Sequence, residues 1–242
     1  MSADASRALR RDGRLAGVVY LVVVLAGMFC LAWVPSRLGS AQGPASAWAG
    51  AAAQVGVFRA GIAAFALMQV AFLMLPLTLY RVLGDVDRHA AVSMVALASV
   101  SVPIGMVALM HRMEALSLLE GAGMQAAESV QAAYALCTQR YGYCLRVANL
   151  FWGLWLLPFG YLVLRSGRLP RLLGVLLVLG GLGYALQFFG ALVPGFAESA
   201  FVRHANTPAG LGEIGSCLWL LAFGARAGRA GAPQPDSTED FA

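Results

Sequence analysis

Residues 15–34 read LAGVVYLVVVLAGMFCLAWV, twenty consecutive residues without a charged side chain. A helix of about 20 apolar residues is long enough to cross the ~30 Å hydrocarbon core of a bilayer. Four arginines between residues 7 and 14 precede the run, an arrangement that secretory signal peptides share. The run is longer than the apolar part of a typical signal peptide, and Trp33, Val34 and Pro35 stand where small cleavage-site residues would be needed. We therefore expect a retained membrane anchor.

The composition of the whole chain extends this interpretation beyond the first run. The 242 residues are 60% hydrophobic and only 12% charged, and the mean hydropathy is +0.72. Soluble domains carry about twice that charged fraction. The net charge of +5 comes from arginine, because all seventeen basic residues are Arg, in small groups at the ends of apolar runs. This placement favours anchoring at a membrane and excludes the basic stripe of a nucleic-acid-binding protein.

Six apolar runs are long enough to predict an all-α, polytopic transmembrane bundle of six spans. They cover residues 15–34, about 57–80, 90–110, 145–164, 172–193 and 209–225. The first run ends at Pro35 and the fifth at Pro194, while the sixth is the shortest.

The arginines between the runs predict the orientation. The two tails and the links 81–88 and 165–171 contain 11 arginines, against 6 on the other side, where the links are much longer. Because short cytoplasmic links are enriched in Arg, we expect both termini in the cytoplasm. The domains are then a basic tail (1–14), one transmembrane domain (15–225) and a disordered tail (226–242).

The segment between spans three and four predicts an amphipathic helix lying on the outer membrane face. Ala127, Val130, Tyr134, Cys137 and Tyr141 fall on one helical stripe. The arm that follows the turn near residue 122 is longer than the arm before it, so we expect a helix break near Gly142. A disulfide between Cys137 and Cys144 would need that break, since ~10.5 Å separates such residues in a continuous helix and the limit is ~7 Å.

Four stretches resemble one family of bacterial membrane proteins. They are RRDGRLAGVVYLVVVLAGMF (10–29), FRAGIAAFALMQVAFLMLPLTLYRVL (58–83), GYLVLRSGRLPRLLGVLLVLGGLGY (160–184) and GEIGSCLWLL (212–221). The third, with its RSG-x-LPR-x-LG pattern, is the most distinctive. In this order they are similar to the domain of unknown function 4386 family. The resemblance implies a six-helix fold in the inner membrane of a bacterial cell and no established activity.

No catalytic or cofactor motif accompanies this fold. The sequence contains no HExxH, no GxSxG and no CxxC. Asp85 and Asp87 read as an isolated pair in a tight turn, and the three histidines fall at the ends of predicted spans. Catalytic residues are therefore not identified, and we expect neither a metal nor a cofactor.

A polar cluster in the outer half of the bundle is the candidate ligand-binding site. Counting from the span ends places polar residues of five helices at a similar depth: Arg59, His111, Arg146, Asn149, Gln187 and Glu213. A charged side chain in hydrocarbon costs on the order of 3 kcal/mol, so Glu213 should face the bundle and pair with Arg59 or Arg146. This pair is either a ligand site or a structural ion pair that locks helices together.

Several functional classes remain open. The first is binding of a small apolar or amphipathic molecule or a lipid, with membrane lipids as the natural surroundings. The alternatives are an accessory or structural membrane protein with no chemistry of its own, or an intramembrane enzyme. Transport is less favoured, because spans one to three do not resemble spans four to six, as internal repeats would require. The sequence does not indicate the oligomeric state or the ligand.

Overall fold

A computed structural model describes residues 3–39, 44–122, 127–196, 199, 202 and 204–226, and these form helices and short connections without any strand. In chain order the elements are α1 (Ala3–Gly27), the π-helix η1 (Met28–Trp33), α2 (Val34–Arg37), α3 (Pro44–Ala53), α4 (Val55–Leu83), α5 (Arg88–Ala122), α6 (Glu128–Leu154), α7 (Leu156–Ser166), α8 (Arg171–Gly190) and α10 (Thr207–Phe223). The fold is all-α, as expected. The basic segment before residue 15 belongs to α1, and the expected tail beyond Arg226 lies outside the described residues.

Five helical stretches are long and apolar enough to cross a membrane, so the chain is a multi-pass membrane protein. They are Asp4–Arg37, Val55–Leu83, Arg88–Gly121, Glu128–Ser166 and Arg171–Gly190. The first four contain the first four predicted runs, and the fifth ends at Gly190, before the predicted end of the fifth run at residue 193. The sixth run forms α10, whose 17 residues measure ~25 Å and fall short of the ~30 Å hydrocarbon core.

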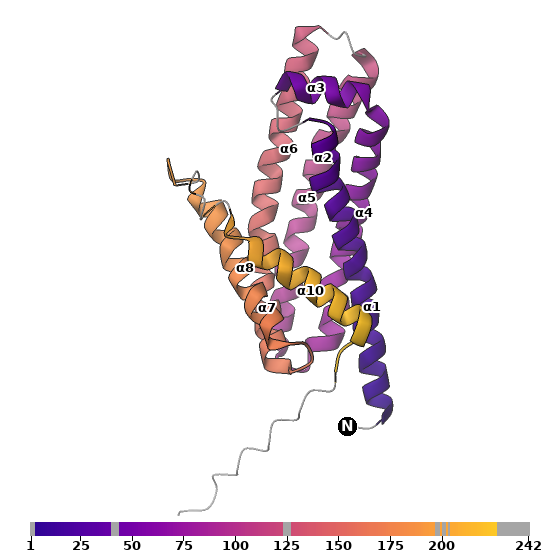
Figure 1. The fold of residues 1–242 in the computed structure, drawn as a ribbon, viewed down its shortest axis with the longest axis vertical. Helices are drawn as coiled ribbons and strands as arrows, with labels where there is room; N and C mark the ends of the chain where they lie inside the picture. Colours follow the sequence, from indigo (N-terminus) through magenta and orange to yellow (C-terminus); the bar gives the residue numbers. More distant parts are fainter. Residues whose placement is uncertain are drawn as a thin grey trace, which may run out of the picture.

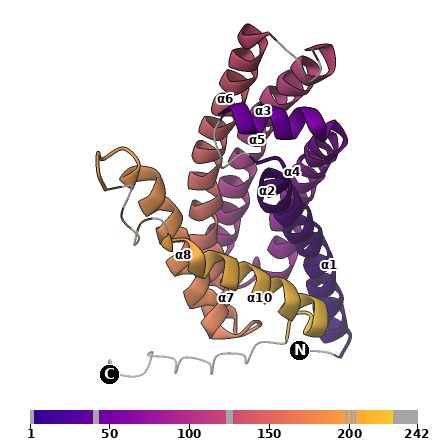
Figure 2. The ribbon, with the colours of Figure 1, turned by 45° about the horizontal axis from the view of Figure 1, so that its top comes forward.

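The helices form a bundle in which α5 packs along α6, α1 packs along α4, and α10 lies between α1 and α8 (Figures 1 and 2). The start of α1, the α4–α5 and α7–α8 connections and the end of α10 gather at the lower end of Figure 1. We call this the arginine-rich end, because the predicted cytoplasmic links lie here. Small residues allow the close packing of α10. A Cβ on Gly17 of α1 would overlap the backbone of Leu221, and a Cβ on Gly180 of α8 would overlap the backbone of Ala209.

The core is divided along the long axis of the molecule. One cluster of buried side chains joins α1, α4, α5, α7, α8 and α10 towards the arginine-rich end. A second joins α2, α3 and the far ends of α4, α5 and α6, with Trp48 of α3 packed edge-on against Tyr134 of α6. The 35 residues of α5 measure ~52 Å, much more than the ~30 Å hydrocarbon core. The second cluster, which we call the distal lobe, is therefore the part of the bundle best placed to project beyond the hydrocarbon.

The first span does not end at Pro35, contrary to the expectation from sequence. The helix widens over Met28–Trp33, where the Val34 N–H donates to the Phe29 carbonyl five residues earlier, and then continues through Pro35 to Arg37. Proline has no N–H to offer the preceding turn. The π-helix accommodates this missing donor inside a continuous helix. Such widened turns are often found at functional sites.

The expected helix break near Gly142 is also wrong. The α6 helix continues from Glu128 to Leu154, so the segment expected to lie as a separate helix on the membrane surface is the first half of α6, packed along α5. The interruption comes instead at Trp155, between α6 and α7, where Pro158 leaves the Leu154 carbonyl without its helical donor. Cys137 and Cys144 are free thiols, as a continuous helix requires.

Replacement of Gly142 by alanine should therefore stabilise the protein. A Cβ at this position would meet no atom within 4 Å, and alanine in a helix interior is favoured over glycine by roughly 0.5–1 kcal/mol. Thermal unfolding of the detergent-solubilised protein measures the change. Gly153→Ala on the same helix is the matched control and should destabilise, because its Cβ would press on Tyr184 and on the Gly181 carbonyl. A loss of stability in Gly142→Ala would contradict a continuous α6.

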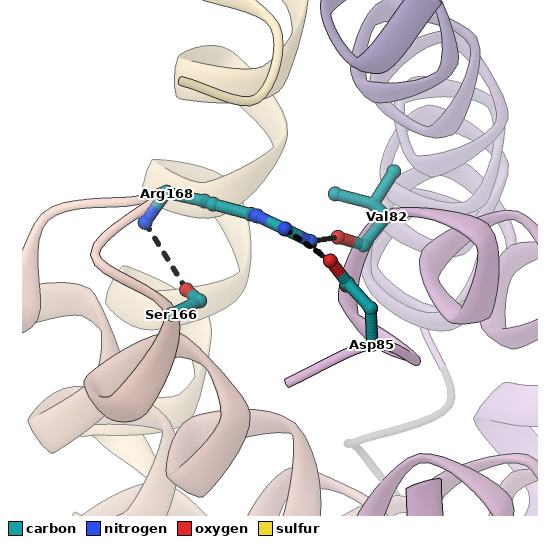
Figure 3. Close-up of polar contacts among 4 residues, drawn as sticks. All are labelled: Val82, Asp85, Ser166 and Arg168. Carbon is teal, nitrogen blue, oxygen red and sulfur yellow. Dashed lines mark hydrogen bonds and ion pairs between the residues drawn. The ribbon is translucent and has the colours of Figure 1, made fainter. Parts of the chain in front are cut away.

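An arginine–aspartate clamp holds the connections together at the arginine-rich end (Figure 3). The Arg168 guanidinium donates to both carboxylate oxygens of Asp85, at 2.6 and 2.5 Å, and to the Val82 carbonyl. The Arg168 backbone N–H donates to Ser166 Oγ at 3.1 Å, next to Gly167, which adopts the left-handed conformation at φ +61°. Asp85 is therefore not part of an isolated pair. Ser166 and Gly167 belong to the distinctive RSG-x-LPR pattern, and Arg168 stands at its unspecified position.

Asp87, the other member of the expected pair, has a separate structural role. Its carboxylate accepts the Ala90 N–H at 3.0 Å and caps the start of α5, and the Tyr161 hydroxyl donates to it at 3.3 Å. The accepted Ala90 N–H lowers the pKa of the Asp87 carboxyl. An aspartate in this position satisfies one of the free N–H groups that begin every helix.

Candidate functional site

Glu213 is the only acidic residue of α10, and it lies on the side of the helix that faces the bundle. The Tyr20 hydroxyl of α1 donates to Glu213 Oε1 at 3.2 Å. Tyr20 is 1% exposed and belongs to the main core cluster, so the packing of this cluster fixes its position. An ionisable side chain in hydrocarbon needs such a hydrogen-bonding partner.

A cavity of about 320 Å³ adjoins this pair. Its walls come from six elements: α1, η1, α4, α6, α8 and α10. Most of the lining is apolar, including Val23, Val24, Met68 and Phe72, whereas its polar groups are Tyr20, Trp152, Tyr184 and Glu213. Ligand-binding cavities in proteins have this character, with apolar walls and a few fixed polar groups, and begin at about 300 Å³.

Aromatic rings form one side of this cavity. The Phe72 ring packs edge-on against Trp152, with centroids 6.4 Å apart, and against Trp155, at 5.4 Å. Trp155 stacks on Phe159 at 5.4 Å and lies 6.5 Å from the Tyr20 ring. The indole N–H of Trp152 is buried without a hydrogen-bond acceptor. The rings pack around Tyr20, and those of Phe72 and Trp152 line the cavity that also contains the Glu213 carboxylate. Aromatic rings near a carboxylate are a setting that attracts organic cations.

The mouth of the cavity opens sideways, between η1 and the first half of α10. Met28 and Ala32 of η1 and Gly210 and Ile214 of α10 line the cavity and are also exposed on the outer surface of the bundle. Met28 is 58% exposed and Ile214 is 42% exposed. These side chains are apolar, so the mouth lies on a surface suited to contact with lipid. The π-helix brings Met28, Leu31 and Ala32 to this opening.

A second hollow of about 250 Å³ lies on the other side of Tyr184. Arg146 and Asn149 of α6 line it together with Gln187 of α8, and Tyr184 lines both hollows. Gln187 Nε2 donates to the Val202 carbonyl and to Asn206 Oδ1, each at 3.0 Å.

The other two members of the predicted cluster lie elsewhere, in the distal lobe. Arg59 of α4 pairs with Glu120 of α5 at 2.5 Å, and His111 pairs with Glu114 at 3.0 Å. These residues are farther from the arginine-rich end than the sequence suggested. Along straight helices, Arg59 is ~36 Å from the end of α4 and Glu213 only ~15 Å from the end of α10.

The predicted cluster is thus divided among three places: Glu213 in the first cavity, Arg146, Asn149 and Gln187 in the second, and Arg59 with His111 in the distal lobe. Within the described part of the chain, no ion pair joins Glu213 to an arginine, so the expected partner is wrong and Tyr20 takes its place. Sequence reasoning missed Tyr20, Trp152 and Tyr184. A signal for Tyr20 was present, because it carries the only hydroxyl of residues 15–34.

This arrangement provides one hydrogen-bonded carboxylate in a cavity lined partly by aromatic rings, which can accept hydrogen bonds and attract positive charge. Among the described residues, no group of three or more His, Cys, Asp or Glu side chains is arranged to hold a metal ion. A carboxylate with one tyrosine donor has further lone pairs for an amine or hydroxyl of a ligand.

One family model, described as a domain of unknown function (DUF4386), matches residues 15–224. The match covers every helix that lines the two hollows. Comparisons with curated proteins and with solved structures found no match.

Proposed function

The chain belongs to the DUF4386 family, and on that premise we propose that it binds an amphipathic small molecule in the Glu213 cavity. The apolar body of the ligand fills the space between α1, α4 and α10, and its amine or hydroxyl group donates to Glu213. The observation that carries this proposal is the Tyr20–Glu213 hydrogen bond at the edge of a cavity of about 320 Å³.

The surroundings favour a cationic head group over an anionic one. The carboxylate of Glu213 repels an anion, and the rings of Tyr20, Phe72 and Trp152 offer their electron-rich faces to a cation. The mouth between Met28 and Ile214 opens on an apolar surface. A ligand that partitions into the bilayer can therefore enter from the side, without crossing polar surface.

We place the protein in the inner membrane of a bacterial cell, with six spans and both termini in the cytoplasm. The arginine distribution supports this orientation. Arg226 N–H donates to the Arg168 carbonyl at 3.3 Å, so the end of α10 and the α7–α8 connection share one end of the bundle. With an even number of spans, the chain must return to the end of the bundle at which it began, and this position of the end of α10 agrees with that. Membrane lipids are the surroundings of all five long helices.

Binding of 10-bromodecylamine to the nanodisc-reconstituted protein tests the proposed function. Bromine quenches nearby tryptophan fluorescence, and Trp152 lines the cavity. We expect the amine to bind more tightly than 10-bromodecanol and much more tightly than 10-bromodecanoate. Glu213→Gln should weaken amine binding about 10- to 100-fold, because a charge-assisted hydrogen bond contributes roughly 1.5–3 kcal/mol.

Glu114→Gln is the matched control, since Glu114 is a carboxylate of the distal lobe that pairs with His111 outside the cavity. It should leave amine affinity unchanged. If Glu213 only locks α10 to α1 through Tyr20, Glu213→Gln will lower the melting temperature, and amine affinity will not distinguish it from Glu114→Gln. That result would contradict a ligand site and favour the accessory role.

A further inference from the structure

The second hollow differs from the Glu213 cavity in charge and in position. It lies between α6 and the far half of α8 and has a volume of about 250 Å³. Arg146 and Asn149 are three residues apart on α6, so both side chains belong to the same face of the helix. Both reach the hollow, and both carry N–H donors.

Arg146 gives this hollow a positive charge that no carboxylate of the described residues neutralises within 4.0 Å. The guanidinium carbon of Arg146 lies 5.6 Å from the centre of the Tyr143 ring. A contact with a ring does not use the N–H donors of the guanidinium, which stay available for an anion. Guanidinium groups match the geometry of phosphate oxygens and can bind them with two parallel hydrogen bonds.

The hollow continues onto a strongly apolar surface formed by the end of α8 and the residues that follow it. Leu192 lines the hollow and is 70% exposed, and the neighbouring Phe189 and Val193 are 58% and 53% exposed. A cationic donor group at the edge of an apolar helix face suits a molecule with an anionic head and hydrocarbon chains. The fixed amide of Gln187 forms the opposite wall.

We infer that the Arg146–Asn149 hollow binds the phosphate group of an anionic phospholipid, whose acyl chains lie along the exposed face of α8. This site is independent of the amine site at Glu213 and stands on different residues. Tyr184 lies between the two hollows, so both can be occupied in one molecule.

Isothermal titration of the delipidated protein in maltoside detergent tests this site with dioctanoyl phosphatidylglycerol. We expect binding that weakens 10-fold or more in Arg146→Met and about 5-fold in Asn149→Leu. Arg146→Lys should recover part of the loss, because lysine retains the charge without the planar fork. Arg140→Met is the matched control on the same helix, and it should bind like the wild type. The melting temperature of each variant verifies that the bundle is intact.

Two further probes identify the source of the phosphate. Dioctanoylglycerol, which has the same chains without a phosphate, should bind at least 10-fold more weakly. Inorganic phosphate binding as tightly as the lipid, with the same dependence on Arg146, would assign the site to free phosphate and overturn the phospholipid assignment. Equal binding in Arg146→Met and wild type, an equal loss in Arg140→Met, or tight binding of dioctanoylglycerol would overturn the anion site itself.

Discussion

Substitution of Gly180 by valine should separate α10 from α8 and unfold the half of the bundle that contains the Glu213 cavity. The position has no room for a side chain, because a Cβ would overlap the backbone and Cβ of Ala209 on α10. Backbones approach this closely in membrane proteins only through small residues. The obstructing atoms are mainly backbone atoms, so they cannot move aside as a flexible side chain would.

We expect Gly180→Val to lower the free energy of unfolding by about 3 kcal/mol or more, the upper end of the range for overpacked cores. A large fall in melting temperature, with loss of bromodecylamine binding, would show the effect. Leu182→Val is the matched control, since Leu182 lies on the same helix and is 54% exposed. It should change the stability little. A wild-type melting temperature in Gly180→Val would contradict the packing of α10 on α8.

Arg168→Met should produce the second large effect, by breaking the clamp at the arginine-rich end. The Arg168 side chain is 11% exposed, whereas that of Asp85 is 64% exposed. Loss of a fully buried partner typically costs 3–5 kcal/mol, and the exposure of Asp85 reduces this, so we expect roughly 2–4 kcal/mol. The Val82 carbonyl also loses its donor. Arg165→Met is the control, since Arg165 is an exposed neighbour that contacts the Tyr161 ring.

The same clamp should make stability depend on pH. The hydrogen bonds from Arg168 lower the pKa of the Asp85 carboxyl, and burial only partly opposes them. In the folded protein this pKa lies below the unfolded value of about 3.9. The clamp therefore adds its full contribution to the free energy of unfolding above about pH 3.9, and it loses this contribution as the pH falls through the folded-state pKa. Asp85→Asn should therefore melt below the wild type at pH 7, and the difference should shrink below about pH 4. A constant difference across this range would contradict the ionic clamp.

The long apolar runs predicted the fold class and the approximate position of each helix, because hydrophobicity alone decides which segments enter a bilayer. They did not predict where the helices end. Neither Pro35 nor Gly142 interrupts its helix: a π-helix accommodates the proline, and α6, which packs along α5, continues through the glycine. The apolar runs also did not predict the distal lobe, because its helices continue beyond the segments that the hydrocarbon core requires to be apolar.

The candidate site was predicted in part. Glu213 was selected because a lone acidic residue in an apolar run needs a partner, and the structure gives it one. Its predicted partner was wrong. The prediction estimated the depth of each residue in the membrane from the start of its apolar run, which assumes that all the helices have the same length. The α4 and α5 helices extend into the distal lobe, so Arg59 and His111 lie well beyond the depth of Glu213. Tyr20 and Tyr184 were not predicted, because a tyrosine within an apolar run cannot be distinguished by sequence from an aromatic residue that only packs in the core.

Photolabelling with a decylamine that carries a diazirine on its alkyl chain tests the central claim most directly, because it reports where the ligand is bound. In nanodiscs, we expect labelled peptides to contain Val24, Met28 and Met68, which line the Glu213 cavity. Excess decylamine should suppress this labelling, and Glu213→Gln should reduce it about 10-fold or more. Labelling confined to lipid-facing side chains such as Leu172 and Leu179, unaffected by competitor or by Glu213→Gln, would contradict a ligand site in this cavity.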